Sequence, residues 1–273
     1  MLAPRHLIFT SLDGALLDSR GGFAEAEEAL VELDRHKVPL VIVTHRTRAE
    51  LDPIRRKIGH NHPFITEGGG GIFFPDAYLN VKIPDAQRIG RYLGVVLGRP
   101  YDEVCTALDE LATECGVGVA GFHHMNLREV ADNTGLRPRD AELAREREFD
   151  EPFYFTTADD AAIRRFVELA KERGFTVRPD GAFWHISGGC DAARAVRMMS
   201  KLFRDASRSK LRAVGIASSE ENPSWLQATD QTVLLSGRGA EFDESATVVR
   251  RKPTPHYPAG PAGWNQAILD IIG

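Results

Sequence analysis

Short apolar runs alternate with amphipathic stretches from the beginning of the chain. Residues 7–10 and 39–43 have the continuous apolar pattern of buried strands, and residues 23–36 and 48–58 have the spacing of amphipathic helices. Strands that alternate with helices in this way are typical of βαβ units, in which the strands run parallel. The pattern therefore predicts an α/β fold with an open parallel sheet covered by helices.

The middle of the chain departs from this alternation. From about residue 84 to about residue 179 the pattern becomes richer in helices, and afterwards the alternation of strands and helices returns. The predicted organisation is a core domain of residues 1–83 and 180–273, interrupted by an inserted α+β domain of residues 84–179. Just before the insert, four consecutive glycines at positions 68–71 predict a sharp turn between two strands.

Composition and charge exclude several classes of function. A net charge of -5 offers no basic excess for the phosphates of a nucleic acid, so no nucleic-acid partner is expected. No apolar run approaches the length of a membrane span, and the chain starts without a signal region, so no membrane location is expected. Three cysteines without a pattern suit the reducing cytoplasm, where we expect the protein to reside.

The first predicted strand ends in a motif that carries candidate chemistry. It contains Ser11-Leu12-Asp13-Gly14 and resembles the first motif of the haloacid dehalogenase (HAD) superfamily, in which a strand ends in Asp-x-Asp-Gly. In that superfamily the first Asp attacks phosphorus and the second handles the proton of the leaving group. Asp13 keeps the second carboxylate, whereas Ser11 stands where the nucleophile is expected.

The whole chain resembles one branch of this superfamily, the mannosyl-3-phosphoglycerate phosphatases and their close relatives. The resemblance is carried by residues 47–59, 63–75, 133–153, 183–196 and 260–269. It implies a HAD-like Rossmannoid parallel-sheet core, with the insert as a C2-type cap domain and a cleft between the two. It also implies a phosphatase reaction on a sugar phosphate with Mg²⁺ as the cofactor.

The departures from the family pattern fall on the chemistry. The family has Asp-Lys-Gly in its third motif, but Asp191 is followed here by Ala192, so the lysine is missing. In the fourth motif, Ser218 and Asn222 stand where the family has two metal-binding Asp residues. Because Mg²⁺ prefers carboxylate oxygens among its protein ligands, these replacements weaken the expected metal site.

The resemblance assigns three groups of site residues. The catalytic positions are Ser11, Asp13, Thr44 at the second-motif hydroxyl, and Ala192 at the lysine. The substrate-binding positions are Arg46, Glu67, Gly68, Gly69, Arg147 and Phe183. The metal positions are Asp13, Ser218 and Asn222.

Structural roles remain open for several of these residues. Ser11 can be a small residue at a strand end, Asp13 can stabilise a turn, and Thr44 can cap the helix that follows. Glu220 and Glu221 offer replacement oxygens for a metal, but acidic residues also suit the start of a helix. The histidines at positions 60, 62, 123 and 124 could ligate a metal. Adjacent histidines are expected to point in different directions, and surface loops are the favoured interpretation for both clusters.

Two hypotheses for function follow, and they differ on whether the chain is an enzyme. Serine is a poor nucleophile unless an adjacent base activates it, and losing one member of a catalytic unit can lower a rate by about 10⁴ to 10⁶. The first hypothesis is a catalytically degenerate homologue without a cofactor, which binds a phosphorylated sugar acid or a protein partner in the cleft. The alternative is an active Mg²⁺-dependent phosphatase that uses Glu220 or Glu221 for the metal and Ser11 or Asp13 for the attack.

Overall fold

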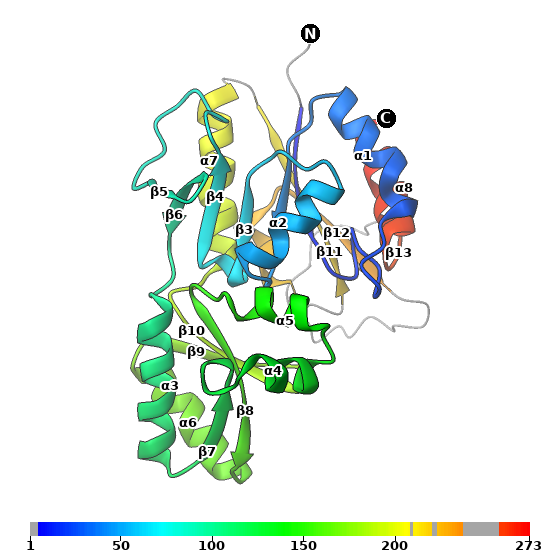
Figure 1. Cartoon of the computed structure of the whole chain (residues 1–273). Helices are drawn as coiled ribbons and strands as arrows, with labels where there is room; N and C mark the ends of the chain where they lie inside the picture. The colour runs from blue at the N-terminus through cyan, green and yellow to red at the C-terminus, as the bar shows by residue number, and fades with distance from the viewer. Residues whose placement is uncertain (1–4, 208–209, 220–222, 237–256) are drawn as a thin grey trace.

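The computed structural model describes residues 5–207, 210–219, 223–236 and 257–273. The candidate residues Glu220, Glu221 and Asn222 lie outside the described residues. Two sheets organise the described parts, and they lie one above the other in Figure 1. Within these parts, no helix combines the length and the apolar character needed to span a membrane.

The larger sheet has nine strands in the order β13-β12-β11-β1-β2-β3-β4-β6-β5. They are β1 (His6–Ser11), β2 (Leu40–Val43), β3 (Phe64–Thr66), β4 (Gly71–Pro75), β5 (Gln87–Ile89), β6 (Tyr92–Val96), β11 (Arg212–Ser218), β12 (Gln231–Ser236) and β13 (Tyr257–Pro258). The strands from β13 to β3 run parallel, and β4, β6 and β5 continue the sheet antiparallel. The predicted α/β fold class is confirmed.

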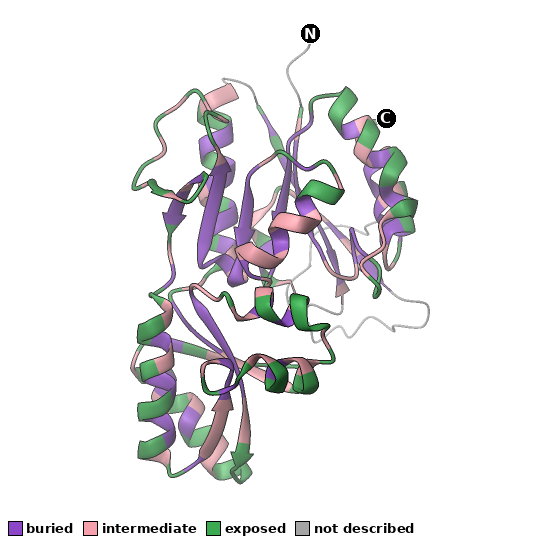
Figure 2. Cartoon of the chain, in the orientation of Figure 1, coloured by how far each residue is buried: buried purple, intermediate pink, exposed green. Residues whose placement is uncertain are grey.

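Helices cover both faces of the larger sheet because successive strand residues point to opposite sides. Ile8 of β1 belongs to a buried cluster with η1 (Ala24–Ala26), α1 (Glu27–Arg35), α2 (Arg48–Lys57) and α8 (Pro261–Ile272). Its neighbours Leu7 and Phe9 pack on the other face with α7 (Ala192–Ser207) and η5 (Ser224–Ala228). Figure 2 shows the central strands of this sheet as buried between the two helical layers.

The smaller sheet belongs to the cap and has four antiparallel strands in the order β7-β8-β10-β9. They are β7 (Gly118–Gly121), β8 (Asp150–Thr157), β9 (Phe175–Asp180) and β10 (Phe183–Gly188). One face packs against α3 (Tyr101–Cys115) and α6 (Asp160–Glu172). Between β7 and β8 lie η3 (Phe122–His124), α4 (Leu127–Thr134) and α5 (Pro138–Arg145), which form a second apolar cluster.

Sheet membership places the domain boundaries later than the sequence predicts. β5 and β6 fall within the predicted insert of residues 84–179, but they extend the larger sheet beside β4. β10 falls within the predicted core segment 180–273, but it pairs with β8 and β9 in the cap. Alternation of apolar residues shows which side chains share a face and does not show which strand is the neighbour. By sheet membership the cap lies between β6 and α7.

His60 and His62 lie in a hydrogen-bonded cluster around Arg55, near the end of α2. Arg55 donates from Nε to His60 Nδ1 at 3.0 Å, and from a terminal nitrogen to the carbonyl of His62 at 2.9 Å. His60 Nε2 in turn donates to the carbonyl of Leu40 at 2.7 Å. Both ring nitrogens of His60 are therefore used within the fold. Its exposure of 6% shows that the expected surface loop is wrong for this residue.

We expect these buried histidines to reduce stability in mild acid. Burial, helped by Arg55, lowers the pKa of His60 well below its usual value, and burial lowers the pKa of His62 to about 4. Between pH 6.5 and 4 the unfolded chain binds protons at these side chains that the folded chain does not, so stability falls as the pH falls. When the pH falls from 7 to 5, the free energy of unfolding should decrease by about 2 kcal/mol more in the natural chain than in His60→Gln. Urea unfolding at both pH values measures this difference, and equal losses would contradict the prediction.

Candidate functional site

The carboxyl ends of β1 and β11 bring Ser11 and Ser218 together. The two strands are parallel neighbours, and the backbone N–H of Ser218 donates to Ser11 Oγ at 3.3 Å. Ser11 is fully buried and Ser218 is 1% exposed. Gly14 approaches so closely that a Cβ at its position would lie 2.9 Å from Ser218 Oγ. The nucleophile position and the first metal position thus lie side by side in a tightly packed environment.

Asp13 is paired with Arg46. The guanidinium donates from Nε and a terminal nitrogen to the two carboxylate oxygens, at 2.9 and 2.6 Å. Thr44 Oγ1 accepts the backbone N–H of Arg46 at 3.1 Å and so orders the loop after β2. The helix-capping role considered for Thr44 belongs to Thr47, which forms a capping box with Glu50 at the start of α2.

Ala192 begins α7 at the place of the family's lysine and contributes only a methyl group. Asp191 precedes this helix, and its carboxylate accepts the backbone N–H of Arg194 at 2.8 Å. Gly69, in η2 (Glu67–Gly69), packs against the same helix start with a φ of 97°. A Cβ at this glycine would lie 2.4 Å from the backbone nitrogen of Ala192. Close packing therefore explains why position 69 is a glycine.

The described residues at this edge do not fit a magnesium site. Mg²⁺ sites in proteins include one or two carboxylates among oxygen ligands. Positions 11 and 218 carry hydroxyl side chains in a packed environment, and the carboxylate of Asp13 is paired with Arg46. Asn222, the remaining expected metal position, lies outside the described residues. The described part of the site therefore supports no chemistry through a bound Mg²⁺.

Glu67, expected at the substrate, lies at the junction of core and cap. One carboxylate oxygen accepts the backbone N–H groups of Phe149 at 2.8 Å and Asp150 at 3.0 Å, and both oxygens accept that of Glu148 at 3.1 Å. Burial raises the pKa of Glu67 to about 7, against the opposing effect of Arg147. This carboxylate of the core therefore holds the beginning of the cap strand β8 in place through hydrogen bonds.

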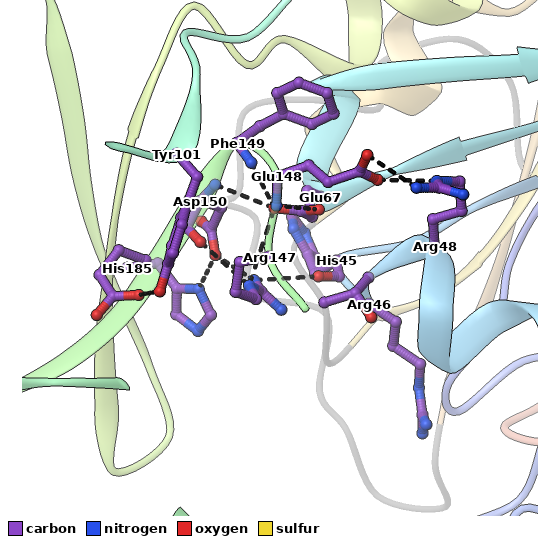
Figure 3. A network of polar contacts seen from close by, with 12 residues as sticks. His45, Arg46, Arg48, Glu67, Tyr101, Arg147, Glu148, Phe149, Asp150 and His185 are labelled. Atoms are coloured by element: carbon purple, nitrogen blue, oxygen red, sulfur yellow. Dashed lines mark hydrogen bonds and ion pairs between the residues drawn. The ribbon is translucent and has the colours of Figure 1, made fainter. Parts of the chain in front are cut away.

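Arg147 also lies in this junction, with its side chain 5% exposed. It pairs with the carboxylate of Asp150, donates from Nε to the Asp150 carbonyl at 3.1 Å, and lies 3.8 Å from Glu67 Oε2. Asp150 also accepts from His185 Nδ1 at 2.7 Å. Burial opposes ionisation of Asp150, but His185 and Arg147 outweigh it and lower the pKa. Glu67, Arg147, Asp150 and His185 form what we call the junction network (Figure 3). The expected substrate-binding positions 67 and 147 are thus parts of a buried structural network.

Two other expected substrate positions also have packing roles. The ring of Phe183 lies 5.6 Å from that of Phe122 and 6.1 Å from that of Tyr154, within the cluster of α4 and α5. Gly68 has a φ of 61°, and a Cβ there would lie 3.0 Å from His45 Nδ1. A glycine at this position leaves room for the imidazole of His45.

A cavity of about 240 Å³ lies beside the junction network, between core and cap. Its core side is lined by His45, Glu67, Gly68, Asp191, Ala192, Pro223, Ser224 and Trp225, and its cap side by Asp150, Thr176, Arg178, Ser187 and Cys190. Arg178 reaches across from β9 and donates to His45 Nδ1 at 3.0 Å. Of the described catalytic positions, Ala192 reaches this cavity, whereas Ser11 and Asp13 are not among its lining residues.

Sequence reasoning missed the polar face of the cap sheet. Thr176 and Arg178 of β9 stand opposite Ser187 and His185 of β10. Alternate residues of a strand share a face, so these four side chains point to one side, while their apolar neighbours pack with α3 and α6 on the other. The alternation of polar residues along both strands is the signal that could have found them.

Comparison with known proteins begins with the sequence. No protein-family model matches the chain. A glucosyl-3-phosphoglycerate/mannosyl-3-phosphoglycerate phosphatase of Methanococcoides burtonii is 32% identical over 270 residues, which cover 98% of each chain. The protein of the same name from Persephonella marina is 32% identical over 97% of each chain. A mannosyl-3-phosphoglycerate phosphatase of Pyrococcus furiosus is 26% identical and covers 90% of this chain and 97% of its own.

Solved structures show the same fold at much lower identity. A Thermoplasma acidophilum protein, 15% identical, superimposes with a TM-score of 0.62 and covers 97% of each chain. A haloacid dehalogenase-like hydrolase from Bacteroides thetaiotaomicron, 14% identical, has a TM-score of 0.59 and covers 98% of this chain and 99% of its own. The resemblance found in the motifs is thus confirmed along almost the entire chain. The chain belongs to the mannosyl-3-phosphoglycerate phosphatase family of the HAD-like hydrolases.

Proposed function

We propose that this chain binds a phosphorylated sugar acid between core and cap and does not hydrolyse it. The observation that carries this proposal is the state of the nucleophile position. Ser11 is fully buried, and its Oγ accepts the backbone N–H of Ser218. A serine nucleophile must reach phosphorus and also needs an adjacent base. The carboxylate of Asp13, two residues away, is paired with Arg46.

The other catalytic positions support the same proposal. Ala192 supplies no positive charge to offset the negative charge of a phosphate, and Ser218 supplies no carboxylate to a metal. Groups that act as a unit in catalysis can each be worth about 10⁴ to 10⁶ in rate, and their losses do not simply add. Binding without turnover is the function that such a site retains.

The cavity beside the junction network has features of an anion site. Arg178 supplies a guanidinium, which binds phosphate or carboxylate groups through parallel hydrogen bonds. Thr176 and Ser187 supply hydroxyl groups, and α7 begins at the cavity with Ala192, where the helix dipole favours negative charge. Its volume of about 240 Å³ is below the roughly 300–1,000 Å³ of most ligand pockets. We therefore expect it to hold the phosphoglycerate part of a glycosyl-3-phosphoglycerate, the substrate class in the relatives' names.

Release of phosphate is expected to be negligible even with Mg²⁺ present. The assay supplies mannosyl- or glucosyl-3-phosphoglycerate, with the Methanococcoides burtonii relative as the positive control. Turnover in the ordinary enzyme range of roughly 1 to 10³ per second, abolished by Asp13→Asn, would overturn the proposal. That result would establish the alternative, an active phosphatase.

Binding of glucosyl-3-phosphoglycerate is expected without added metal and is measured by calorimetry. Arg178→Gln should weaken it by about 10- to 100-fold, because hydrogen bonds to charged groups contribute roughly 1.5–3 kcal/mol. Arg164→Gln is the matched control, since Arg164 is an exposed arginine of the cap helix α6. Equal affinities of the natural chain and Arg178→Gln would place the ligand elsewhere. Absence of binding by the natural chain would contradict the proposal that it binds a phosphorylated sugar acid.

A further inference from the structure

Two adjacent histidines and an aspartate converge on the surface of the cap, outside the cavity described above. Asp109 lies on α3, and His123 and His124 lie in η3, directly after β7. His124 Nε2 is 3.0 Å and His123 Nε2 is 3.3 Å from Asp109 Oδ1. The two imidazole rings have centroids 3.7 Å apart. The prediction that these histidines point in different directions is wrong, since both rings turn toward Asp109.

The separations of these atoms are close to those of a metal coordination shell. Zn²⁺ binds imidazole nitrogen and carboxylate oxygen at about 2.0–2.2 Å in tetrahedral geometry, so neighbouring ligand atoms lie about 3.3 Å apart. The two nitrogens stand 3.0 and 3.3 Å from Asp109 Oδ1. All three ligand atoms lie within 4.8 Å of one another. Small movements of the side chains would therefore suffice to admit a cation between them.

A buried carboxylate orients His123 for this role. His123 Nδ1 lies 2.7 Å from Glu151 Oε1, and Glu151 is fully buried. The other oxygen of Glu151 accepts the hydroxyl of Tyr101 at 2.6 Å. The bond from Nδ1 to Glu151 leaves Nε2 of His123 turned toward the carboxylate of Asp109, 3.4 Å from its Oδ2, where a metal ion would replace the hydrogen on Nε2. A carboxylate behind a histidine is the usual outer partner of a metal-bound imidazole.

We propose that Asp109, His123 and His124 bind a divalent cation of the zinc type and so link α3 to the segment after β7. Imidazole nitrogen suits Zn²⁺, Co²⁺, Ni²⁺ and Cu²⁺ better than Mg²⁺, which seeks oxygen ligands. Three protein ligands leave a fourth tetrahedral position, which water fills. The site lies in the cap and uses none of the catalytic, substrate-binding or metal positions that the resemblance assigns.

Binding requires one rearrangement within the site. His124 Nδ1 accepts the backbone N–H of Gly121 at 3.1 Å, so the hydrogen of the neutral ring lies on Nε2. Ligation through Nε2 moves this hydrogen to Nδ1 and gives up the bond to Gly121. The affinity is therefore expected to be lower than that of a site with all its ligands oriented in advance.

A second set of ligands lies deeper, formed by Cys105, His123 and Glu151. A metal there would compete with the hydrogen bonds that Glu151 already accepts from Tyr101 and His123. The outer set has its ligand atoms on partly exposed side chains, where a hydrated cation can reach them. The geometry therefore favours the outer set.

Titration of the untagged, metal-free chain with Zn²⁺ in a calorimeter tests the proposal. We expect saturation at one equivalent, and with Co²⁺ the absorption spectrum of tetrahedral coordination. His124→Ala and Asp109→Asn should each weaken Zn²⁺ binding by at least about tenfold, and Glu151→Gln, behind the ligand, by about 10- to 100-fold. His36→Ala is the matched control, because His36 is an exposed histidine beside Glu32 on α1. It should bind Zn²⁺ as the natural chain does.

Three results would overturn the proposal. One is the absence of saturable Zn²⁺ binding by the natural chain with an intact circular dichroism spectrum. Another is unchanged affinity in His124→Ala, a substitution at a partly exposed side chain that should not disturb folding. The third is loss of binding in Cys105→Ser together with full affinity in Asp109→Asn, which would assign the metal to the deeper set.

Discussion

Restoring the four family residues is expected to create Mg²⁺-dependent phosphatase activity in this chain. The variant carries Ser11→Asp, Ala192→Lys, Ser218→Asp and Asn222→Asp. The present side chains at 11 and 218 lie on neighbouring strands, with Ser11 Oγ 3.3 Å from the Ser218 nitrogen, so carboxylates there can share one cation. A lysine at 192 would offset the phosphate charge at the start of α7. We expect phosphate release at least about 10³-fold above that of the natural chain, because each missing group is worth about 10⁴ to 10⁶ within the unit.

Restoring only one or two of the four family residues should not restore phosphatase activity. Ser11→Asp alone is expected to give almost no activity, since an unneutralised carboxylate repels the phosphate it must attack. Ser11→Asp with Ser218→Asp puts two like charges into positions that are at most 1% exposed. Without Mg²⁺ we expect this pair to lower the Tm by about 5–10 °C, and with Mg²⁺ we expect most of the loss to be recovered. The Tm of the natural chain should not respond to Mg²⁺.

Calorimetry with Mg²⁺ and thermal unfolding of the folded quadruple variant check both expectations. A folded variant that neither binds Mg²⁺ nor releases phosphate would show that the cleft has diverged beyond these four side chains. An equal response of the natural chain and the variant to Mg²⁺ would place the metal at a site other than positions 11 and 218.

The meeting of Ser11 and Ser218 could be predicted because parallel strands present their carboxyl ends at one edge of a sheet. The apolar run before Ser11 identified its strand, and the resemblance assigned Ser218 to the same site, which the pairing of the two strands confirms. The pairing of Asp13 with Arg46 could not be predicted in this way. It depends on the path of two loops, 33 residues apart in sequence, and apolar periodicity carries no information on loop paths.

The buried contacts of Glu67 and Arg147 could not be predicted for a related reason. The resemblance assigns both to substrate, but the bonds that occupy Glu67 come from backbone groups 81 to 83 residues later in the chain. Only the docking of the cap on the core brings them together. Burial then decides the role, because a buried charge must find partners within the protein. Arg178 was missed because the polar face of the cap sheet is completed only when β9 pairs with β10.

Removal of Arg147 is expected to be the most destabilising single substitution outside the apolar core. Arg147→Met keeps the volume of the side chain but leaves Glu67 and Asp150 as buried carboxyl groups without their cation. Breaking a buried ion pair by removing one partner costs about 3–5 kcal/mol. Urea unfolding at pH 7 measures the loss. Arg139→Met is the matched control, since Arg139 is an exposed arginine on α5, and it should change stability by no more than about 0.5 kcal/mol.

The pH dependence distinguishes this electrostatic cause from a loss of packing. In the natural chain the pKa of Glu67 is raised to about 7, so the folded chain binds a proton that the unfolded chain has released, and stability falls as the pH rises toward 7. Arg147 opposes that rise in pKa, so the pKa of Glu67 should be higher still in Arg147→Met. Above pH 7 the free energy of unfolding of the variant should therefore continue to fall by about 1.4 kcal/mol per pH unit, whereas that of the natural chain should no longer fall. A deficit of equal size at pH 7 and pH 8 would mean that Arg147 acts through packing alone. In Arg147→Met with Glu67→Gln the additional loss above pH 7 should disappear, because the group that titrates is gone.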